Sequence, residues 1–253
     1  RRSGTRLLLA FGSLFVGALT LSIVLGLIGS VERFFVSESK TLLGGDITIE
    51  DDVAIAKTHP TLTALRDSGA TLSARIETIA VVQSQVTSGA DGLASLLVSL
   101  KVVDSEYPLY GKLGLSDEAL RTPLPDEIFL AEDALVRMGL SVGDMLTLGK
   151  AEFRIANVVT SEPDRVGGSF RLGPLALLSH EGFARTGIDG KQSRVDHILS
   201  VRYPSNFVSA DEARATTQIQ ESFPRPQYRV AIAKDGPASL LRILDSAERF
   251  FFT

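Results

Sequence analysis

The sequence predicts an α+β protein in which one N-terminal transmembrane helix precedes a large extracytoplasmic domain of two subdomains. Three observations support this prediction: an uncharged apolar run near the N-terminus, strand and helix signals at both ends of the remaining chain, and a β-rich stretch between them. The 253 residues are enough for one large domain or two small ones.

The apolar run extends from Leu7 to Ile28 and contains no charged residue. At a rise of about 1.5 Å per residue, it is long enough to cross a hydrocarbon core of about 30 Å. A cleaved signal peptide is the main alternative, but its apolar core is shorter and a small-residue cleavage site follows it. Residues 29–33 contain no such site, so we expect an uncleaved anchor.

The flanking charges predict the orientation of this anchor. Arg1, Arg2 and Arg6 precede the apolar run without any acidic residue, which places the N-terminus in the cytoplasm and the rest outside. The chain beyond residue 28 has 23 basic and 30 acidic residues, a net charge of −7. This acidic balance argues against binding of nucleic acid or of anionic lipid headgroups.

Small residues recur at four-residue spacing in the predicted membrane helix, as one face of Ala18, Ser22 and Gly26 and as a second pair of Ser13 and Gly17. Such faces allow helix backbones to approach closely in lipid, so we expect this helix to pack against other membrane helices. The alternative is that small residues are simply common in membrane helices. The predicted packing face consists of Ser13, Gly17, Ala18, Ser22 and Gly26.

Two amphipathic segments flank the outer domain. Residues 29–45 continue the first helix with a one-sided apolar pattern that Gly44 and Gly45 end, and residues 236–253 show a similar pattern. We expect both to be stalk helices, the second leading to another membrane span; an amphipathic helix docked on the domain is the alternative. The predicted contact between the stalks involves Val31, Phe34, Phe35, Leu240, Leu241, Leu244 and Phe251.

Between the stalks, strand–helix–strand patterns bracket a β-rich insertion. The first unit has expected strands at 46–50, 72–85 and 93–103, a helix at 61–68 and a loop at 107–115. The insertion has expected strands at 128–131, 145–148, 152–159 and 175–178, a helix at 132–138 that Gly139 ends, and a polar loop at 161–173. The last unit has strands at 197–203 and 227–233 and a helix at 210–223, with Ser209 as its cap.

We find no catalytic, cofactor-binding or metal-binding pattern in the sequence. His59, His180 and His197 are far apart and lack ligand spacing, and neither a G-x-S-x-G motif nor a nucleotide-binding glycine loop is present. The acidic run at residues 50–52 is expected to be solvated, because a calcium site needs more oxygen ligands at spaced positions. A membrane-anchored hydrolase would need a nucleophile–base pair that the sequence does not reveal.

Several segments together resemble the periplasmic domain of FtsX-like ABC transporter permeases with a MacB-type core. Residues 138–149, MGLSVGDMLTLG, are similar to a turn-and-strand motif of that family, and residues 153–159, FRIANVV, to the strand after it. LLGGDI at residues 42–47 and SEPDR at residues 161–165 are similar to the YbbP-type branch. The family motif begins with leucine where this chain has Met138.

The resemblance implies a domain plan and a function. Residues 1–28 would be the cytoplasmic flank and first span, 29–45 a stalk, 46–235 a periplasmic core and 236–253 a second stalk. Within the core, a porter-like βαβ subdomain (46–120 and 195–235) would be interrupted by a sabre-like β-rich subdomain (125–190). The protein would be a permease in the bacterial inner membrane that relays ATP-driven motion to its periplasmic domain.

The resemblance also implies partners. A separate ABC ATPase would drive the permease through parts beyond residue 253, and a second permease copy would form a homodimer in the lipid bilayer. The cargo would be hydrophobic, lipid-like or peptidic, and the chain itself would not be an enzyme and would need no cofactor. A single-pass anchored periplasmic binding or adaptor module is the alternative.

Overall fold

The structure is a computed structural model of the whole chain, which describes residues 38–84, 95–119, 122–164, 173–188, 194–224 and 226–235. The predicted membrane span, its packing face and the predicted stalk contacts lie outside these residues and remain predictions. No helix within the described ranges is long and apolar enough to cross a membrane. The chain divides into a short unit, Arg1–Ser39, and a main unit, Lys40–Thr253, and the following description concerns the main unit.

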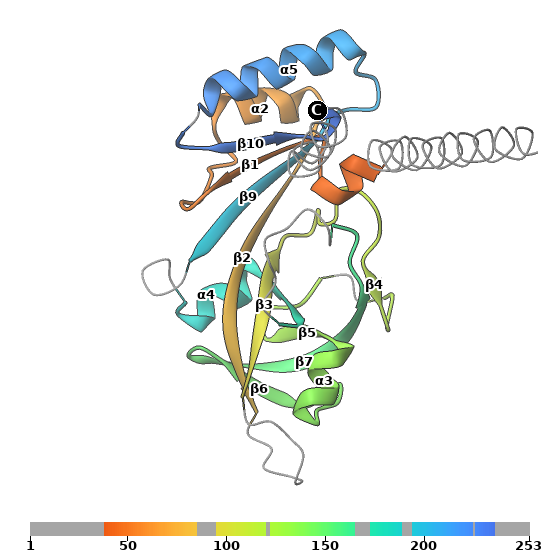
Figure 1. Cartoon of the computed structure of the whole chain (residues 1–253), viewed down its shortest axis with the longest axis vertical. Helices are drawn as coiled ribbons and strands as arrows, with labels where there is room; N and C mark the ends of the chain where they lie inside the picture. The colour runs from red at the N-terminus through yellow and green to blue at the C-terminus, as the bar shows by residue number, and fades with distance from the viewer. Residues whose placement is uncertain are drawn as a thin grey trace, which may run out of the picture. The chain divides into compact units, whose positions relative to one another are not determined.

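The described elements confirm the mixed α/β fold class (Figure 1). Residues 38–43 are helical, and a short 3-10 turn at Ala233–Asp235 closes the described chain. The strands are β1 (Ile47–Asp51), β2 (Thr71–Ser84), β3 (Ser95–Val103), β4 (Gly114–Leu115), β5 (Glu127–Ala131), β6 (Met145–Leu148), β7 (Ala151–Ser161), β8 (Leu175–Ser179), β9 (Val195–Arg202) and β10 (Arg229–Ile232). The helices are α2 (Pro60–Asp67), α3 (Glu132–Met138), α4 (His180–Thr186) and α5 (Ser209–Ser222).

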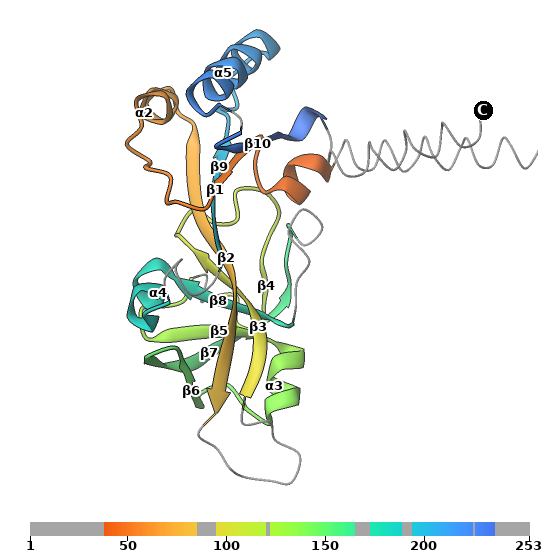
Figure 2. The same ribbon diagram turned by 60° about the vertical axis from the view of Figure 1, so that its left-hand side comes forward.

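Strands β10, β1, β9 and β2 form an antiparallel sheet, in that order, with α2 and α5 over one face (Figures 1 and 2). Alternate residues of each strand face these helices, so Ile47, Ile49 and Leu199 join Leu62 of α2 and Ile219 of α5 in one buried core. Each of these side chains is at most 1% exposed, and apolar burial of this kind is what holds helices on a sheet.

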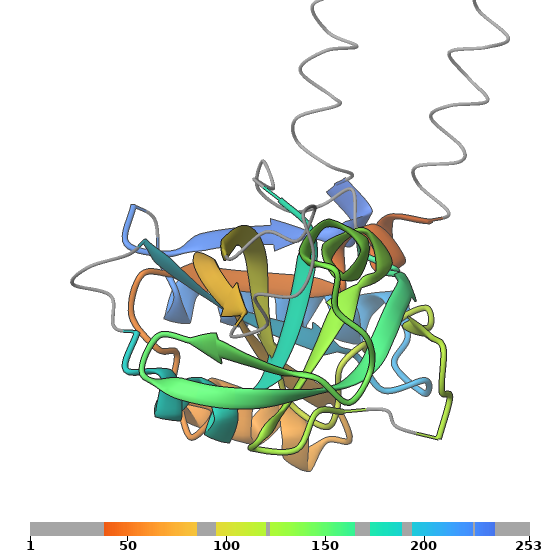
Figure 3. The same ribbon diagram turned by 90° about the horizontal axis from the view of Figure 1, so that it is seen from below.

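Six strands close into a barrel next to this sheet (Figure 3). The pairings run β2–β3–β8–β5–β7–β6, and β6 pairs back to β2 with Val82 opposite Leu148. A second core fills the barrel, and α3 adds Leu135 and Met138 to it. Closure leaves these six strands without an unpaired edge along the ring.

Strand β2 links the two cores. Its first half pairs with β9 and places Leu72 in the core under the helices, whereas Ile76 and Val82 lie in the barrel core. The two cores support the predicted division into two subdomains, which itself stays a prediction. The structure adds that β2 and β3, both within residues 46–120, build the barrel together with the β-rich insertion.

The expected loop at 107–115 contains the short strand β4, and two helix starts also differ from the expectations. No helix is expected after β8, but α4 begins there. The Ser179 hydroxyl caps it by accepting a hydrogen bond from the Gly182 N–H at 3.1 Å. Ser209 does not cap α5: Val208 is the cap residue, and its N–H donates to the Asp211 carboxylate at 3.3 Å.

Candidate functional site

A fully buried lysine marks the candidate site. Lys101 lies on β3 opposite Glu77 of β2, and only 1% of it is exposed. Its neighbours Leu100 and Val102 face the barrel core, so Lys101 points to the opposite face of the strand. A charge in such a position is unfavourable unless it is paired and hydrogen-bonded.

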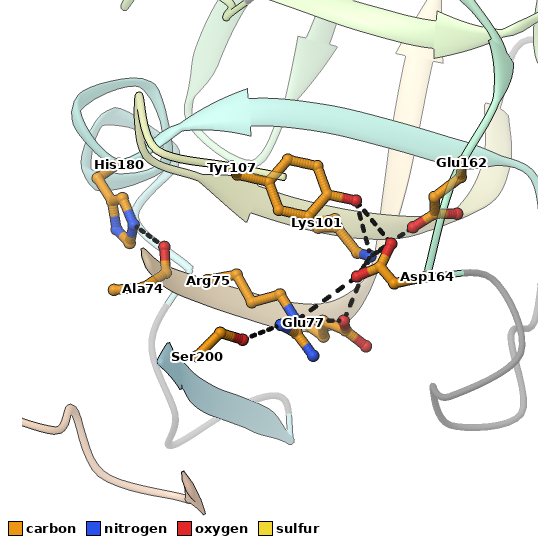
Figure 4. Close-up of polar contacts among 9 residues, drawn as sticks. All are labelled: Ala74, Arg75, Glu77, Lys101, Tyr107, Glu162, Asp164, His180 and Ser200. Carbon is orange, nitrogen blue, oxygen red and sulfur yellow. Dashed lines mark hydrogen bonds and ion pairs between the residues drawn. The ribbon is translucent and has the colours of Figure 1, made fainter. Parts of the chain in front are cut away.

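Acidic side chains from two other parts of the chain surround the Lys101 ammonium group (Figure 4). Its Nζ forms an ion pair with Glu162, lies 3.0 Å from Asp164 Oδ2 and is 3.5 Å from Glu77 Oε1. The Tyr107 hydroxyl donates to Asp164 Oδ1 at 2.7 Å. The lysine therefore has the partners that its burial requires.

Arg75 of β2 extends this cluster toward β9, in the sheet that α2 and α5 cover. Its Nε is 3.1 Å from Glu77 Oε1 and 3.9 Å from Asp164 Oδ2, and its Nη1 donates to the Ser200 hydroxyl at 2.6 Å. The polar cluster, defined as Arg75, Glu77, Lys101, Tyr107, Glu162, Asp164 and Ser200, thus contains two cations and three carboxylates. It joins β2, β3 and β9 to the segment after β7.

The electrostatics favour the charged form of Asp164. Burial alone would raise the pKa of its carboxyl, but the charges of Lys101 and Arg75 and the hydrogen bond from Tyr107 hold that pKa well below its usual range. Burial, followed by the nearby carboxylates of Asp164 and Glu162, raises the pKa of Tyr107 far above its usual value, so the phenol stays a donor.

The cluster fixes the start of the predicted 161–173 loop. Glu162 and Asp164 belong to the SEPDR segment, and both carboxylates bind Lys101. Between them, Pro163 lies against Gly111, where an added Cβ would come within 2.6 Å of its ring and 3.0 Å of Thr41 Cγ2. The SEPDR segment is therefore held between the sheet and residues near the end of the predicted first stalk.

Gly44 brings that stalk end onto the cluster itself. Its φ of +76° is a conformation that glycine adopts at low cost, and a Cβ there would lie 3.1 Å from Arg75 Nη1 and 3.5 Å from Asp164 Oδ2. The glycines of the LLGGDI segment therefore allow the backbone to approach the cluster closely, and they also end the helix.

Asp46 anchors the same segment to the domain. Its carboxylate pairs with Lys40 at 2.6 Å, and it accepts hydrogen bonds from the Tyr110 hydroxyl at 2.7 Å and the Tyr203 N–H at 2.8 Å. Charge-assisted bonds of this type are stronger than neutral ones. We call residues 40–46, with these contacts, the stalk junction.

The chain enters and leaves the domain at one place. Strands β1 and β10 are antiparallel with Ile47 opposite Ile232, and the Ala233 N–H donates to the Asp46 carbonyl at 2.9 Å. The segments before residue 46 and after residue 233, which the sequence predicts to be stalks, therefore begin at adjacent points.

The histidines are not brought together as a metal site. His59 packs on Phe223, whereas the His180 ring Nε2 lies 3.0 Å from the Ala74 carbonyl. Burial and the neighbouring His180 lower the pKa of His197. Within the described ranges, no group of three or more histidine, cysteine or acidic residues is arranged to hold a metal ion.

The polar cluster was not predicted from the sequence, although one signal pointed to it. Lys101 interrupts the apolar run LLVSLKVV, and a lysine within a buried strand requires a partner. The partners themselves could not be found, because Glu162 and Asp164 are 61 and 63 positions further along the chain.

Comparison with known proteins relates this arrangement to transporters. No family model matches the chain. The chain is 32% identical over 154 residues to YbbP of Escherichia coli (strain K12), described as an uncharacterized ABC transporter permease. The resemblance to ABC transporter permeases is confirmed. The match covers 61% of this chain and 18% of the permease, so the chain spans less than a fifth of that relative's length.

Two solved structures are similar to the chain over most of its length. The periplasmic region of MacB from Actinobacillus actinomycetemcomitans is 12% identical with a TM-score of 0.48, over 81% of this chain and 95% of that chain. The extracellular domain of the noncanonic ABC-type transporter YknZ from Gram-positive bacteria is 10% identical with a TM-score of 0.43, over 73% and 99%. Both scores are below 0.5, so the fold described above rests on the contacts within this chain.

Proposed function

We propose that the chain is part of a permease subunit of an ABC transporter of the mechanotransmission type, with the described domain in the periplasm. The stalk junction carries this proposal. It ties the end of the predicted first stalk to the sheet of β10, β1, β9 and β2, beside the point where the chain leaves the domain. Motion of the stalks would thereby reach the sheet directly.

The polar cluster supplies the next link in this proposal. Gly44 of the stalk junction lies so close to Arg75 and Asp164 that a side chain there would meet both, and Asp164 binds Lys101 on the barrel strand β3. A displacement of the junction would therefore act on both the SEPDR segment and the barrel. The carboxylates are held by buried cations, which suits them for mechanical coupling and not for proton transfer or nucleophilic attack.

The partners follow from this mechanism. A separate ABC ATPase would supply the motion from the cytoplasm, and a second copy of the permease would form the other half of a homodimer in the inner membrane. The relayed motion would export or extract hydrophobic, lipid-like or peptide cargo. This chain would then be a non-catalytic subunit.

The test uses the full-length permease, purified from its native host and reconstituted in lipid nanodiscs. An ABC ATPase should co-purify with it, and a spin label at Val142→Cys, an exposed turn residue, should report a distance between copies that changes when nucleotide binds. These 253 residues contain no cysteine, so Val142→Cys is the only labelling site within them.

A variant of the stalk junction separates coupling from assembly. Asp46→Ala should keep the ATPase bound but reduce the nucleotide-dependent change in distance, because it removes the anchor bonds of the junction. Asp133→Ala, which alters an exposed aspartate of α3, is the matched control and should behave as the parent protein. A full-length protein that binds no ATPase would refute the proposal in favour of an anchored binding module.

A further inference from the structure

A cavity of about 500 Å³ lies where the N-terminus of α2 meets the C-terminus of α5. The segment at residues 51–56 forms one side of it, and the cap residues His59 of α2 and Phe223 of α5 form another. Its size is within the range of small-molecule sites, about 300–1,000 Å³. The cavity is separate from the polar cluster, with which it shares no residue.

Aromatic rings form its apolar wall. The His59 and Phe223 ring centroids are 4.7 Å apart, and the Tyr228 ring meets Phe223 edge-on at 5.1 Å. Val53 and Ile55 also line the cavity, and Val53 is 65% exposed. A ligand with an apolar body would cover these surfaces and remove them from water.

The described residues of the cavity lining carry a net negative charge. They include Asp51 and Asp52, and none of them is a lysine or an arginine. The adjacent acids are paired, since Arg229 binds Glu50 and Arg194 lies 3.1 Å from Asp196. Across the described ranges, Asp51 and Asp52 have no such ion pair.

The two neighbouring carboxylates also disfavour each other's charge. Burial raises the pKa of Asp51, and the side-chain hydrogen bond and repulsion with Asp52 add to that effect, while hydrogen bonds from the Asp52 and Val53 N–H groups oppose it. A bound cation would relieve this repulsion. In addition, the faces of aromatic rings attract cations, so the wall and the carboxylates favour the same kind of ligand.

We propose that this cavity binds an organic cation, an ammonium or guanidinium group on an apolar or aromatic body. The cation would lie by Asp51 and Asp52, and the apolar body would pack on Phe223 and Tyr228. The proposal does not depend on permease function, because it rests on the lining of the cavity alone.

Binding is tested with benzyltrimethylammonium as the probe. The full chain is placed in nanodiscs of phosphatidylcholine, which has no net charge, and titrated by isothermal calorimetry at neutral pH without nucleotide. Benzyl alcohol and benzoate, which keep the ring but lack the positive charge, are the matched ligands. We expect the cation to bind at least about tenfold more tightly than either.

Variants locate the binding to the cavity. Asp51→Asn with Asp52→Asn should weaken binding of the cation by at least about tenfold, and Tyr228→Leu should weaken it by about threefold or more. Asp67→Asn, which removes an exposed charge at the end of α2, is the control and should leave affinity unchanged. Thermal unfolding shows whether each variant is folded.

Three results would overturn the proposal: no binding of the cation at millimolar concentration, equal binding of benzyl alcohol, or unchanged affinity in the folded double variant. None of them involves the ATPase, so they would leave the permease proposal intact. Conversely, a full-length protein without an ATPase partner would leave the cation site untouched.

Discussion

Lys101 holds together a buried polar region whose other residues cannot be identified from the sequence around the lysine. The ammonium group is almost completely buried and is held by carboxylates from β2 and from the segment after β7. Its need for partners is predictable from its place in an apolar strand, but their identity depends on a chain crossing that no local pattern specifies.

Replacing this lysine should therefore be costly. Lys101→Met leaves buried carboxylates without their main cation, and we expect the free energy of unfolding to fall by about 3–5 kcal/mol. Thermal or urea unfolding followed by circular dichroism measures the loss.

Lys57 offers a control for that experiment. It pairs with Asp104 at 2.7 Å, but its side chain is 38% exposed. Lys57→Met should cost at most about 1 kcal/mol, because solvent screens such pairs. If the two variants lost the same free energy of unfolding, burial would not be what makes the ion pairs of Lys101 important for stability.

The pH dependence of stability follows from Asp164. Its pKa is lower in the folded protein than the unfolded value of about 3.9, so its contribution is fully present above that value. The contribution is lost as the pH falls through the lower, folded pKa. Acid titration of unfolding should show the parent losing stability below about pH 4, and Asp164→Asn should flatten that slope. A parallel slope in both proteins would assign the acid sensitivity to other groups.

At the scale of elements, most strands and helices of the main unit were predictable from local pattern. The helix at 132–138 and its end at Gly139 were expected and are confirmed, because an apolar face and a left-handed glycine mark them together. The closure of β6 on β2 was not predicted, because alternation of apolar residues gives each strand a face but not a neighbour.

Helix capping gives a matched test at this scale. Ser179→Ala should lower the free energy of unfolding by about 1 kcal/mol, because its hydroxyl caps α4. Ser209→Ala should have almost no effect, since Ser209 is exposed and the Asp211 carboxylate holds the Val208 N–H at the start of α5. Chemical denaturation of both variants measures the free energy of unfolding. A larger decrease for Ser209→Ala than for Ser179→Ala would mean that Ser209 does cap α5.

At the scale of the whole main unit, two cores share one long strand. Because β2 contributes to both, unfolding of the barrel removes a strand from the helix-covered sheet. Sequence patterns could indicate two subdomains, but this sharing depends on the register of β2 with β9 and β3, which is long-range.

Because both cores contain residues of β2, we expect the barrel and the helix-covered sheet to lose stability together. Leu148→Ala removes a fully buried side chain from the barrel seam, and we expect a loss of about 2–5 kcal/mol. The sheet covered by α2 and α5 should lose stability with it, so hydrogen exchange of Ile47 and Leu199 should accelerate in the variant. Exchange that changes only in barrel residues would mean that the two cores unfold independently.

The adjacent positions of Asp46 and Ala233 determine how the domain can bear load. When the two flanking segments are drawn in the same direction, β1 and β10 move together and the force is resisted by the backbone hydrogen bonds between β1 and β9 at once, as in shear. When they are pulled apart, the pairing of β1 with β10 opens from its end one bond at a time, as a zipper does. The domain is therefore stiff toward joint motion of the two segments and yields when they separate.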